Sequence, residues 1–538
     1  MPNQLSRFGC RRSESVPESA EYRYRKMRSE QTMRQIEKWC IFEVSLSGHA
    51  DGNPYTDYTI SGTFTGSGET VTTDGFYDGD GIYKVRFMPS CEGKYHYVIT
   101  GTFSEKGEEG DFLVTAAAPG NHGPVRVRNT YHFRYEDGTP YYSIGTTAYA
   151  WVNQSLELQQ ETLATLAKAP FNKIRFCFWP KHYDYNLAEP LSYPYERLKD
   201  GETDILEGKV PHVYPPVEKY DSRFNFKKFN PAHFRRFDLR IRQLMDLGIE
   251  ADLIVMHPYD RWGFSHMPAE CDDLYWRYVI ARYGAYRNVW WSLANEYDLF
   301  EDKTNADWER MGELIAAKDP YHHLRSIHNC RSLFDHSAPW ITHCSLQRQD
   351  LYRHVEYTDD FRVRYGKPVV WDEIAYEGNI NHGWGNISGQ EMVRRFWEAS
   401  MRGGYAGHGE TFLYVDGKQT DVLWWAHGGT LHGESPDRLW FLRKILEETP
   451  KGAGLRLTEG IFDETVAVPD CFLPDRYEIH YYGFGRPSFR TFHSDEPVAA
   501  EIIDTWNMTV TKAGTFSGDF RIDLPGREWM AIRLRAAE

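Results

Sequence analysis

Two short apolar runs, each ending on acidic residues, constrain the fold of this chain more than any other feature. They are Asn288–Glu296 (NVWWSLANE) and Lys367–Ile374 (KPVVWDEI), and both are rich in strand-forming residues. An unpaired carboxylate is costly to bury, so strands that finish on acids are expected to end at a wet cavity. Because helical sequence lies between and around the two runs, we expect their acids to face each other across a cleft.

Strand-like and helix-like segments alternate on both sides of these runs. The clearest helix begins at Asn230-Pro231, an N-cap residue followed by a proline, and ends at Gly248. The strand candidates are, in order, 140–145, 173–178, 251–256, 289–294, 325–327, 340–344, 369–371 and 404–408. Eight strands with intervening helices predict an α/β fold, a (β/α)8 TIM barrel with its active site at the carboxyl ends of the strands.

Strand-rich sequence without helical periodicity flanks the predicted barrel. We predict an N-terminal immunoglobulin-like β-sandwich over 36–117, the barrel over 118–450 and a C-terminal β-sandwich over 451–538. Residues 1–35 are polar and arginine-rich, and we expect a disordered or non-native tail. The stretch 180–229 contains six tyrosines, and we expect a long loop that walls the cleft.

Composition limits the class of partner. The formal charge is −15 and no long basic run occurs, so no nucleic-acid partner is expected. No apolar stretch suits a membrane span or the core of a signal peptide, and the 8 cysteines are scattered without a C-x-x-C pair. These features favour a cytoplasmic protein with reduced thiols and no membrane partner.

Glu296 and Glu373, which end the two runs, are the candidate catalytic pair. A glycosidic bond is cleaved by one acid that protonates the leaving oxygen and a second carboxylate that acts as nucleophile or base. A structural role is the simpler interpretation for either acid alone, but the two motifs together favour a glycosidase. Two neighbours compete with Glu373: we expect Asp372 to point toward the helices by strand alternation, and Glu377 to lie in a loop.

The 176–424 region resembles the retaining glycoside hydrolases of clan A, a barrel superfamily that includes cellulases and β-mannanases. In that clan the acid/base is the Glu of an Asn-Glu pair after strand four, matched here by Asn295-Glu296. The nucleophile is a Glu after strand seven, matched by Glu373. The second-strand Arg matches Arg175, with a structural salt bridge as the alternative, and the third-strand His matches His257.

The sixth strand departs from this pattern. Cellulase-like members carry a Tyr that contacts the nucleophile, whereas this chain has His343-Cys344-Ser345. The strand Tyr141–Trp151 and the run Trp371–Gly378 are closer to bacterial families described as apiosidase-like or "collagen-binding". The resemblance implies action on plant or microbial glycans.

Residues that follow the other predicted strands are candidate sugar contacts. The full set is Tyr149, Arg175, Trp179, His257, Asn295, His328, His343, His408, Glu410 and Trp424. Trp425 is the alternative to Trp424. The four histidines could instead converge on a metal, but the short-spacing His pair usual on a first strand is absent, so we predict hydrogen bonds to sugar hydroxyls, no metal and no cofactor.

The sequence therefore predicts a retaining glycoside hydrolase with a two-glutamate double-displacement mechanism. We expect a carboxyl separation of ~5–5.5 Å, and exo action on oligosaccharides if the tyrosine-rich loop closes the cleft. Its partner is a carbohydrate substrate, and a homo-oligomer is compatible with the sequence. The alternative is a non-catalytic glycan-binding protein on a glycosidase scaffold.

Overall fold

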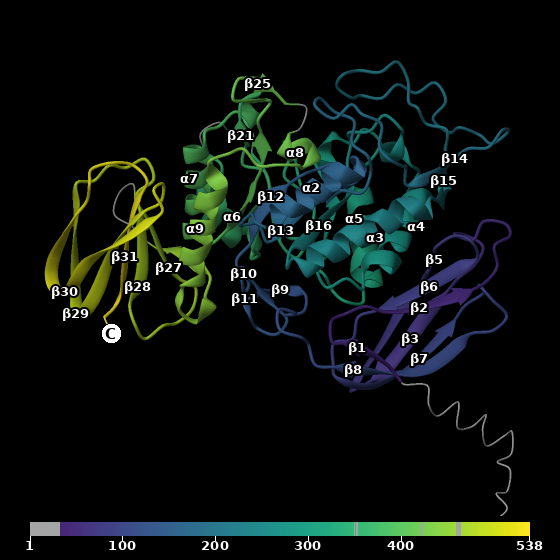
Figure 1. Ribbon diagram of the computed structural model, residues 1–538, viewed down its shortest axis with the longest axis horizontal. Helices are drawn as coiled ribbons and strands as arrows, with labels where there is room; N and C mark the ends of the chain where they lie inside the picture. Colours follow the sequence, from purple (N-terminus) through teal and green to yellow (C-terminus); the bar gives the residue numbers. More distant parts are fainter. Residues whose placement is uncertain (1–32, 349, 351–352, 421–422, 459–463, 538) are drawn as a thin grey trace, which may run out of the picture.

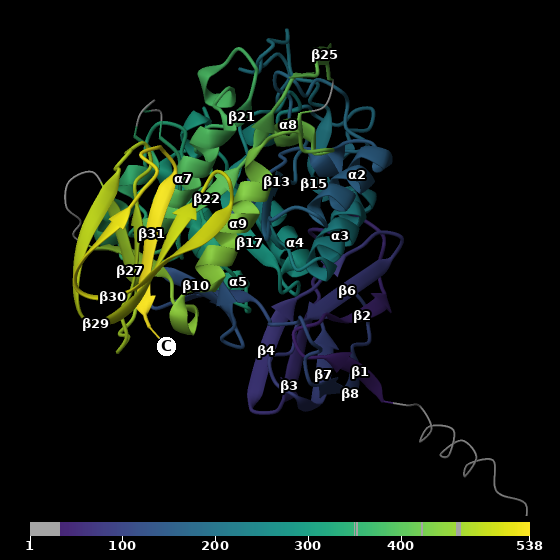
Figure 2. The ribbon, with the colours of Figure 1, turned by 60° about the vertical axis from the view of Figure 1, so that its left-hand side comes forward.

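The computed structural model has a central barrel between two strand-rich units (Figures 1 and 2). It describes residues 33–348, 350, 353–420, 423–458 and 464–537. Residues 1–32, most of the predicted tail, lie outside this part of the chain. None of the described helices is long and apolar enough to cross a lipid bilayer.

Eight parallel strands form the barrel, in the spatial order β18-β17-β16-β13-β12-β22-β20-β19. They are β12 (Ile144–Thr147), β13 (Lys173–Cys177), β16 (Glu250–Met256), β17 (Val289–Ala294), β18 (Arg325–Ser326), β19 (Cys344–Leu346), β20 (Val369–Trp371) and β22 (Tyr405–His408). A single bridge between His328 and Ser345 joins the two end strands, so the barrel is nearly closed. The prediction of a (β/α)8 barrel is confirmed.

Helices surround the barrel (Figure 1). They are α2 (Leu156–Leu166), α3 (Pro231–Asp246), α4 (Ala269–Tyr283), α5 (Asn305–Lys318), α6 (Thr358–Tyr365), α7 (Gly389–Met401), α8 (Trp424–His427) and α9 (Ser435–Glu447). Helix α3 begins as the sequence predicts, because the Asn230 side chain accepts a hydrogen bond from Ala232 N and Pro231 occupies the first turn.

The N-terminal unit is a sandwich of two sheets, ordered β1-β8-β7-β3-β4 and β2-β6-β5. Its strands are β1 (Arg34–Glu37), β2 (Phe42–Ser47), β3 (Ser61–Gly66), β4 (Glu69–Asp74), β5 (Phe76–Tyr77), β6 (Ile82–Phe87), β7 (Gly93–Thr100) and β8 (Glu108–Thr115). Buried ion pairs join it to α3 and α4: Arg86 and Arg282 both bind Asp238, at 3.0 and 2.5 Å.

The C-terminal unit is one six-stranded antiparallel sheet in the order β26-β27-β28-β31-β29-β30. Its strands are β26 (Leu455–Thr458), β27 (Thr465–Pro469), β28 (Tyr477–Tyr481), β29 (Phe489–Asp504), β30 (Thr509–Asp523) and β31 (Met530–Ala536). Figures 1 and 2 place this sheet beside α7 and α9, and Trp397 of α7 stacks on Tyr481 with ring centroids 5.5 Å apart.

The barrel interior is filled in layers. At the amino-terminal end Trp290, Val370 and Tyr405 pack with Phe133, which belongs to a small sheet of β9 (Val125–Arg128), β10 (His132–Tyr135) and β11 (Pro140–Tyr141). Above them Lys173 Nζ lies 2.7 Å from Asp252 and 2.6 Å from Asp372. This buried ion triad fills the barrel beneath its carboxyl face, the face at which barrel active sites lie.

Asp372 therefore points into the barrel, and the prediction that it faces the helices is wrong. Val370 faces the core layer below, so two-residue alternation also turns Asp372 inward. The strand ends at Trp371, and the chain then leaves strand geometry, since Ala375 adopts a positive φ of 64°. The Glu373 side chain can thus also reach the cavity.

The tyrosine-rich stretch is only partly a loop. It contains the antiparallel pair β14 (Tyr195–Arg197) and β15 (Phe224–Phe229), and Tyr195 packs among core aromatics such as Tyr275. Only Lys181 and Tyr183, near its beginning, line the cleft described below.

Candidate active site

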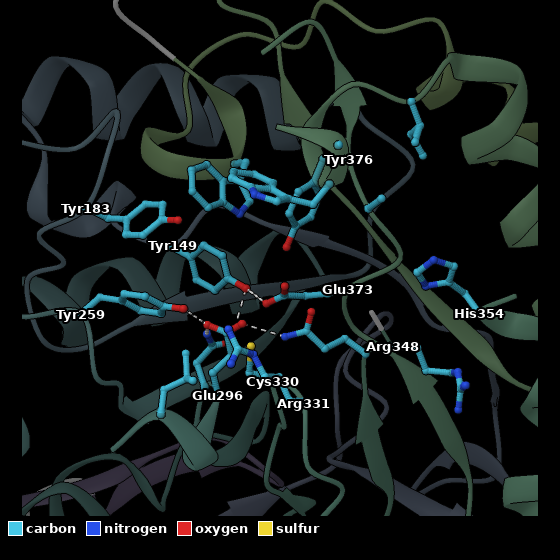
Figure 3. A pocket seen from close by; sticks show the side chains of 18 of the residues that line it. Tyr149, Tyr183, Tyr259, Glu296, Cys330, Arg331, Arg348, His354, Glu373 and Tyr376 are labelled. Carbon is cyan, nitrogen blue, oxygen red and sulfur yellow. Dashed lines mark hydrogen bonds between the residues drawn. The ribbon is translucent and has the colours of Figure 1, made fainter. Parts of the chain in front are cut away.

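A pocket of about 450 Å³ opens at the carboxyl face of the barrel (Figure 3). Glu296 follows β17 and Glu373 follows β20, and both side chains line this pocket. Glu296 adopts a left-handed backbone conformation, with φ at 49°. This conformation is uncommon for a non-glycine residue, and residues held in such conformations cluster at active sites.

Glu373 lies among groups that favour its ionised form. Arg175 Nη1 lies 3.7 Å and His328 Nε2 3.5 Å from Glu373 Oε1, and the Tyr149 hydroxyl donates a hydrogen bond to the same oxygen. Burial on its own would raise the pKa of the Glu373 carboxyl, but His328, Arg175 and Tyr149 outweigh burial and lower the pKa well below its usual range.

Glu296 has the opposite environment. Burial, followed by repulsion from the charged Glu373, raises the pKa of Glu296, while the Tyr259 hydrogen bond and Lys181 act in the other direction. Gln347 Nε2 donates to Glu296 Oε1 at 2.8 Å, and the Tyr259 hydroxyl donates to Oε2. The pocket therefore holds one carboxyl that favours its proton and one that stays ionised, as acid and nucleophile require.

Asn295 links the two acids. Its Oδ1 accepts from Arg175 Nη1 at 2.6 Å and lies 3.3 Å from the Tyr149 hydroxyl oxygen, and its Nδ2 lies 3.4 Å from Glu296 Oε2. Arg175 comes from β13, Tyr149 follows β12 and Asn295 follows β17. The network thus fixes groups from three strands in one arrangement before any ligand arrives.

Aromatic side chains form one wall of the pocket. Trp384 and Trp425 have ring centroids 4.9 Å apart, and Tyr376 lies 5.9 Å from Trp425. The Tyr183 ring completes this side (Figure 3). Flat rings beside hydrogen-bonding carboxylates suit the apolar faces and polar edges of a sugar.

The Lys181 ammonium lies within the aromatic wall. Its Nζ is 4.0 Å from the ring centre of Tyr149, 4.6 Å from Tyr259, 4.8 Å from Trp425 and 5.2 Å from Tyr183. Burial lowers the pKa of Lys181, although the nearby acids oppose this. Cation–π attraction holds the ammonium, and since Nζ donates no hydrogen bond to the described residues, its N–H groups can bind a ligand.

Several predicted contact residues do not line the pocket. Trp179, His257, His408, Glu410 and Trp424 are all buried outside its lining. His408 points outward, because Tyr405 of β22 faces the core and His408, three residues on, therefore faces the helices. Trp424 donates from Nε1 to Thr146 on the outer side of the barrel wall, whereas its neighbour Trp425 lines the pocket.

The prediction that His343 contacts the sugar is wrong. The sixth strand is β19 (Cys344–Leu346), not 340–344, so His343 precedes the strand and lies at the opposite end of the barrel. There its ring packs 5.2 Å from Trp290 and 5.8 Å from Phe133. The same shift brings Gln347 to the carboxyl end of the strand, beside Glu296.

Sequence reasoning missed Lys181, Tyr259 and Gln347. Tyr259 lies two residues beyond the singled-out His257, and Gln347 lies two residues beyond Ser345, so both follow strands as active-site residues of barrels do. The missing sixth-strand Tyr has a counterpart in space, because Tyr149 from the first strand contacts the nucleophile candidate.

Comparisons with known proteins add family information. A profile described as "Apiosidase-like, catalytic domain" matches residues 127–413, and two profiles of domains of unknown function match 35–102 and 466–535. A search of curated proteins returned no match.

Solved structures also match. A candidate glycoside hydrolase from Bacteroides vulgatus is 35% identical, with 94% of this chain and 100% of that chain covered and a TM-score of 0.82. A family 5 glycoside hydrolase from the same organism is 14% identical, with 78% and 94% covered and a TM-score of 0.56, a similarity of fold alone.

Proposed function

The chain belongs to the apiosidase-like family, and from this premise we propose that it is a retaining glycoside hydrolase. The observation that carries the proposal is the pair Glu296 and Glu373, which share one pocket while their surroundings shift the two pKa values in opposite directions. Two carboxyls of this kind are the requirement for glycosidic bond cleavage.

In the first step Glu373 attacks the anomeric carbon, and the bond to the leaving oxygen breaks as Glu296 transfers its proton to that oxygen. The product is a glycosyl ester on Glu373. In the second step Glu296, now ionised, takes a proton from water, whose oxygen attacks the anomeric carbon and releases Glu373. Each step inverts the anomeric centre, so the overall reaction retains its configuration.

The neighbouring groups support these roles. Arg175 and the Tyr149 hydroxyl stabilise the ionised Glu373 before attack and would stabilise it again as the ester breaks. Gln347 and Tyr259 each donate to Glu296, which orients its carboxyl toward the pocket. Trp384 and Trp425 would pack against a sugar ring.

We further propose exo action in the cytoplasm. The pocket volume of about 450 Å³ lies toward the lower end of the range of ~300–1,000 Å³ for small-molecule sites, which favours binding of a chain end. Six cysteines of the described residues carry free thiols, which supports a reducing compartment: Cys40, Cys91, Cys177, Cys271, Cys344 and Cys471. Product analysis on reducing-end-labelled oligosaccharides tests the first point, because endo cleavage would release labelled fragments of several lengths at once.

A panel of aryl glycosides and plant oligosaccharides tests catalysis itself. We expect hydrolysis of at least one substrate by the wild type, loss of turnover in Glu296→Ala and Glu373→Ala, and retained sugar affinity in both variants. Wild-type binding without turnover across the panel would instead favour the non-catalytic glycan-binding protein.

A further inference from the structure

Three ligand-type side chains meet behind the barrel wall, outside the active-site pocket. Glu377, His408 and Glu410 are 2%, 0% and 1% exposed, and their ligand atoms lie within 4.8 Å of one another. Glu377 and Glu410 are paired neighbours in the short parallel strands β21 (Glu377–Gly378) and β23 (Glu410–Thr411). His408 ends β22, two residues before Glu410.

The two carboxylates accept hydrogen bonds from the backbone. Glu377 accepts from the backbone N–H groups of Glu434 and Ser435, and Glu410 Oε2 accepts from His432 N at 2.6 Å. Within the described part of the chain, neither carboxylate has a lysine or arginine partner. Two adjacent buried carboxylates repel each other, so the cluster requires a cation or a proton.

Two atoms of the cluster also lack hydrogen-bond partners. His408 Nε2 and Glu410 Oε1 are buried, 3.5 Å apart, and neither makes a hydrogen bond to the described residues. Thr146 Oγ1 lies 3.1 Å from His408 Nδ1, so it can accept the Nδ1–H proton and leave the Nε2 lone pair free. A metal-binding histidine typically donates its other N–H in this way.

The backbone leaves room for an ion at this point. Gly433 passes so close that an added Cβ would lie 2.5 Å from Glu377 Oε2 and 2.6 Å from Glu410 Oε1. Any side chain at this position would fill the space between the two carboxylates. Glycine keeps both oxygens open.

We propose that Glu377, His408 and Glu410 bind one divalent metal ion. Two carboxylates and one imidazole favour a first-row ion such as Zn²⁺ or Mn²⁺ over Ca²⁺ and Mg²⁺, which prefer oxygen ligands alone. The ion neutralises both carboxylates. It also joins the segment after β20 to the end of β22, and the two carboxylates in turn accept hydrogen bonds from the backbone around the start of α9.

The ion has a structural role. Glu377 lies four residues after Glu373, and Tyr376 between them lines the pocket. Fixing Glu377 therefore fixes the segment that carries the nucleophile candidate. The site does not depend on the proposed glycosidase activity, and its test is independent of turnover.

Metal content and thermal stability test the site. Full-length protein is stripped with EDTA, incubated with an equimolar mixture of Zn²⁺, Mn²⁺, Ca²⁺ and Mg²⁺, dialysed, and analysed by elemental mass spectrometry. We expect one Zn²⁺ or Mn²⁺ per chain and a lower Tm for the stripped protein. No bound ion, together with the same Tm before and after EDTA, would overturn the proposal.

Two variants locate the ion. Glu410→Gln and His408→Gln should each lower the metal content to less than a tenth of the wild-type value. Glu250→Gln is the matched control, since Glu250 is another buried glutamate whose pKa burial raises to about 8, bonded to Trp290 at the far end of the barrel, and this variant should keep the ion. Metal retained by Glu410→Gln would contradict the assignment.

A crystallographic measurement covers the case in which the variants do not fold. Wild-type crystals grown with Zn²⁺ should give an anomalous difference peak between Glu410 and His408. A peak elsewhere, with none at the cluster, would overturn the proposal.

Discussion

Removal of one hydroxyl group tests the electrostatic account of the nucleophile. Tyr149→Phe deletes the hydrogen bond to Glu373 and leaves the ring, which packs edge-on against Trp425 at 5.8 Å and beneath the Lys181 ammonium. A hydrogen bond to a charged group contributes about 1.5–3 kcal/mol. At tenfold per about 1.4 kcal/mol, we expect kcat/KM to fall roughly 10- to 150-fold.

The pH profile gives the sign of the effect. The Tyr149 hydrogen bond stabilises the ionised Glu373, so its loss raises the pKa of that carboxyl. The enzyme needs Glu373 ionised, and the acidic limb of kcat/KM should therefore move to higher pH, by up to about 1–2 units if the full energy is expressed. The alkaline limb, assigned to Glu296, should move much less.

Tyr405→Phe is the matched control. The Tyr405 hydroxyl is also buried and hydrogen-bonded, at 3.0 Å to His132 Nδ1, but at the opposite end of the barrel. This variant should lose stability without any shift of the acidic limb. Equal pH profiles for wild type and Tyr149→Phe, or equal shifts in both variants, would refute the reasoning.

Three further predictions concern other residues. Glu373→Gln should lower the pKa of Glu296, because it removes a neighbouring negative charge; carbon-13 NMR of labelled glutamate measures it, and an unchanged value contradicts the coupling. Lys181→Met should raise KM more than it lowers kcat in steady-state kinetics, since it keeps the packing but removes the donors beside the pocket. Asp238→Asn leaves two buried arginines without their shared carboxylate, so urea unfolding should show a loss of about 3–5 kcal/mol while kcat stays unchanged.

The barrel could be predicted from the sequence because its signals are local. Strand-forming runs ending on acids, the Asn230-Pro231 helix start and the regular alternation of elements depend only on neighbouring residues. The positions of Glu296 and Glu373 follow from the same strand ends, since barrel strands all present their carboxyl ends to one face.

Side-chain direction was harder to predict, because it depends on strand register. The predicted sixth strand begins and ends a few residues too early. His343 was therefore expected at the active-site end of the barrel, and Gln347 was missed. His408 is the last residue of a correctly predicted strand but points outward, as half the residues of a strand must. Lys181 lies in a loop, and its ammonium contacts aromatic rings that are far from it in the sequence. No local sequence pattern predicts such contacts.

The central claim is that Glu373 forms a covalent bond to the sugar while Glu296 acts as acid and then base. Proton NMR of the first hydrolysis product, recorded before the anomers equilibrate, tests this claim most directly. The account predicts that the initial product has the same anomeric configuration as the substrate. An initial product of inverted configuration would contradict it.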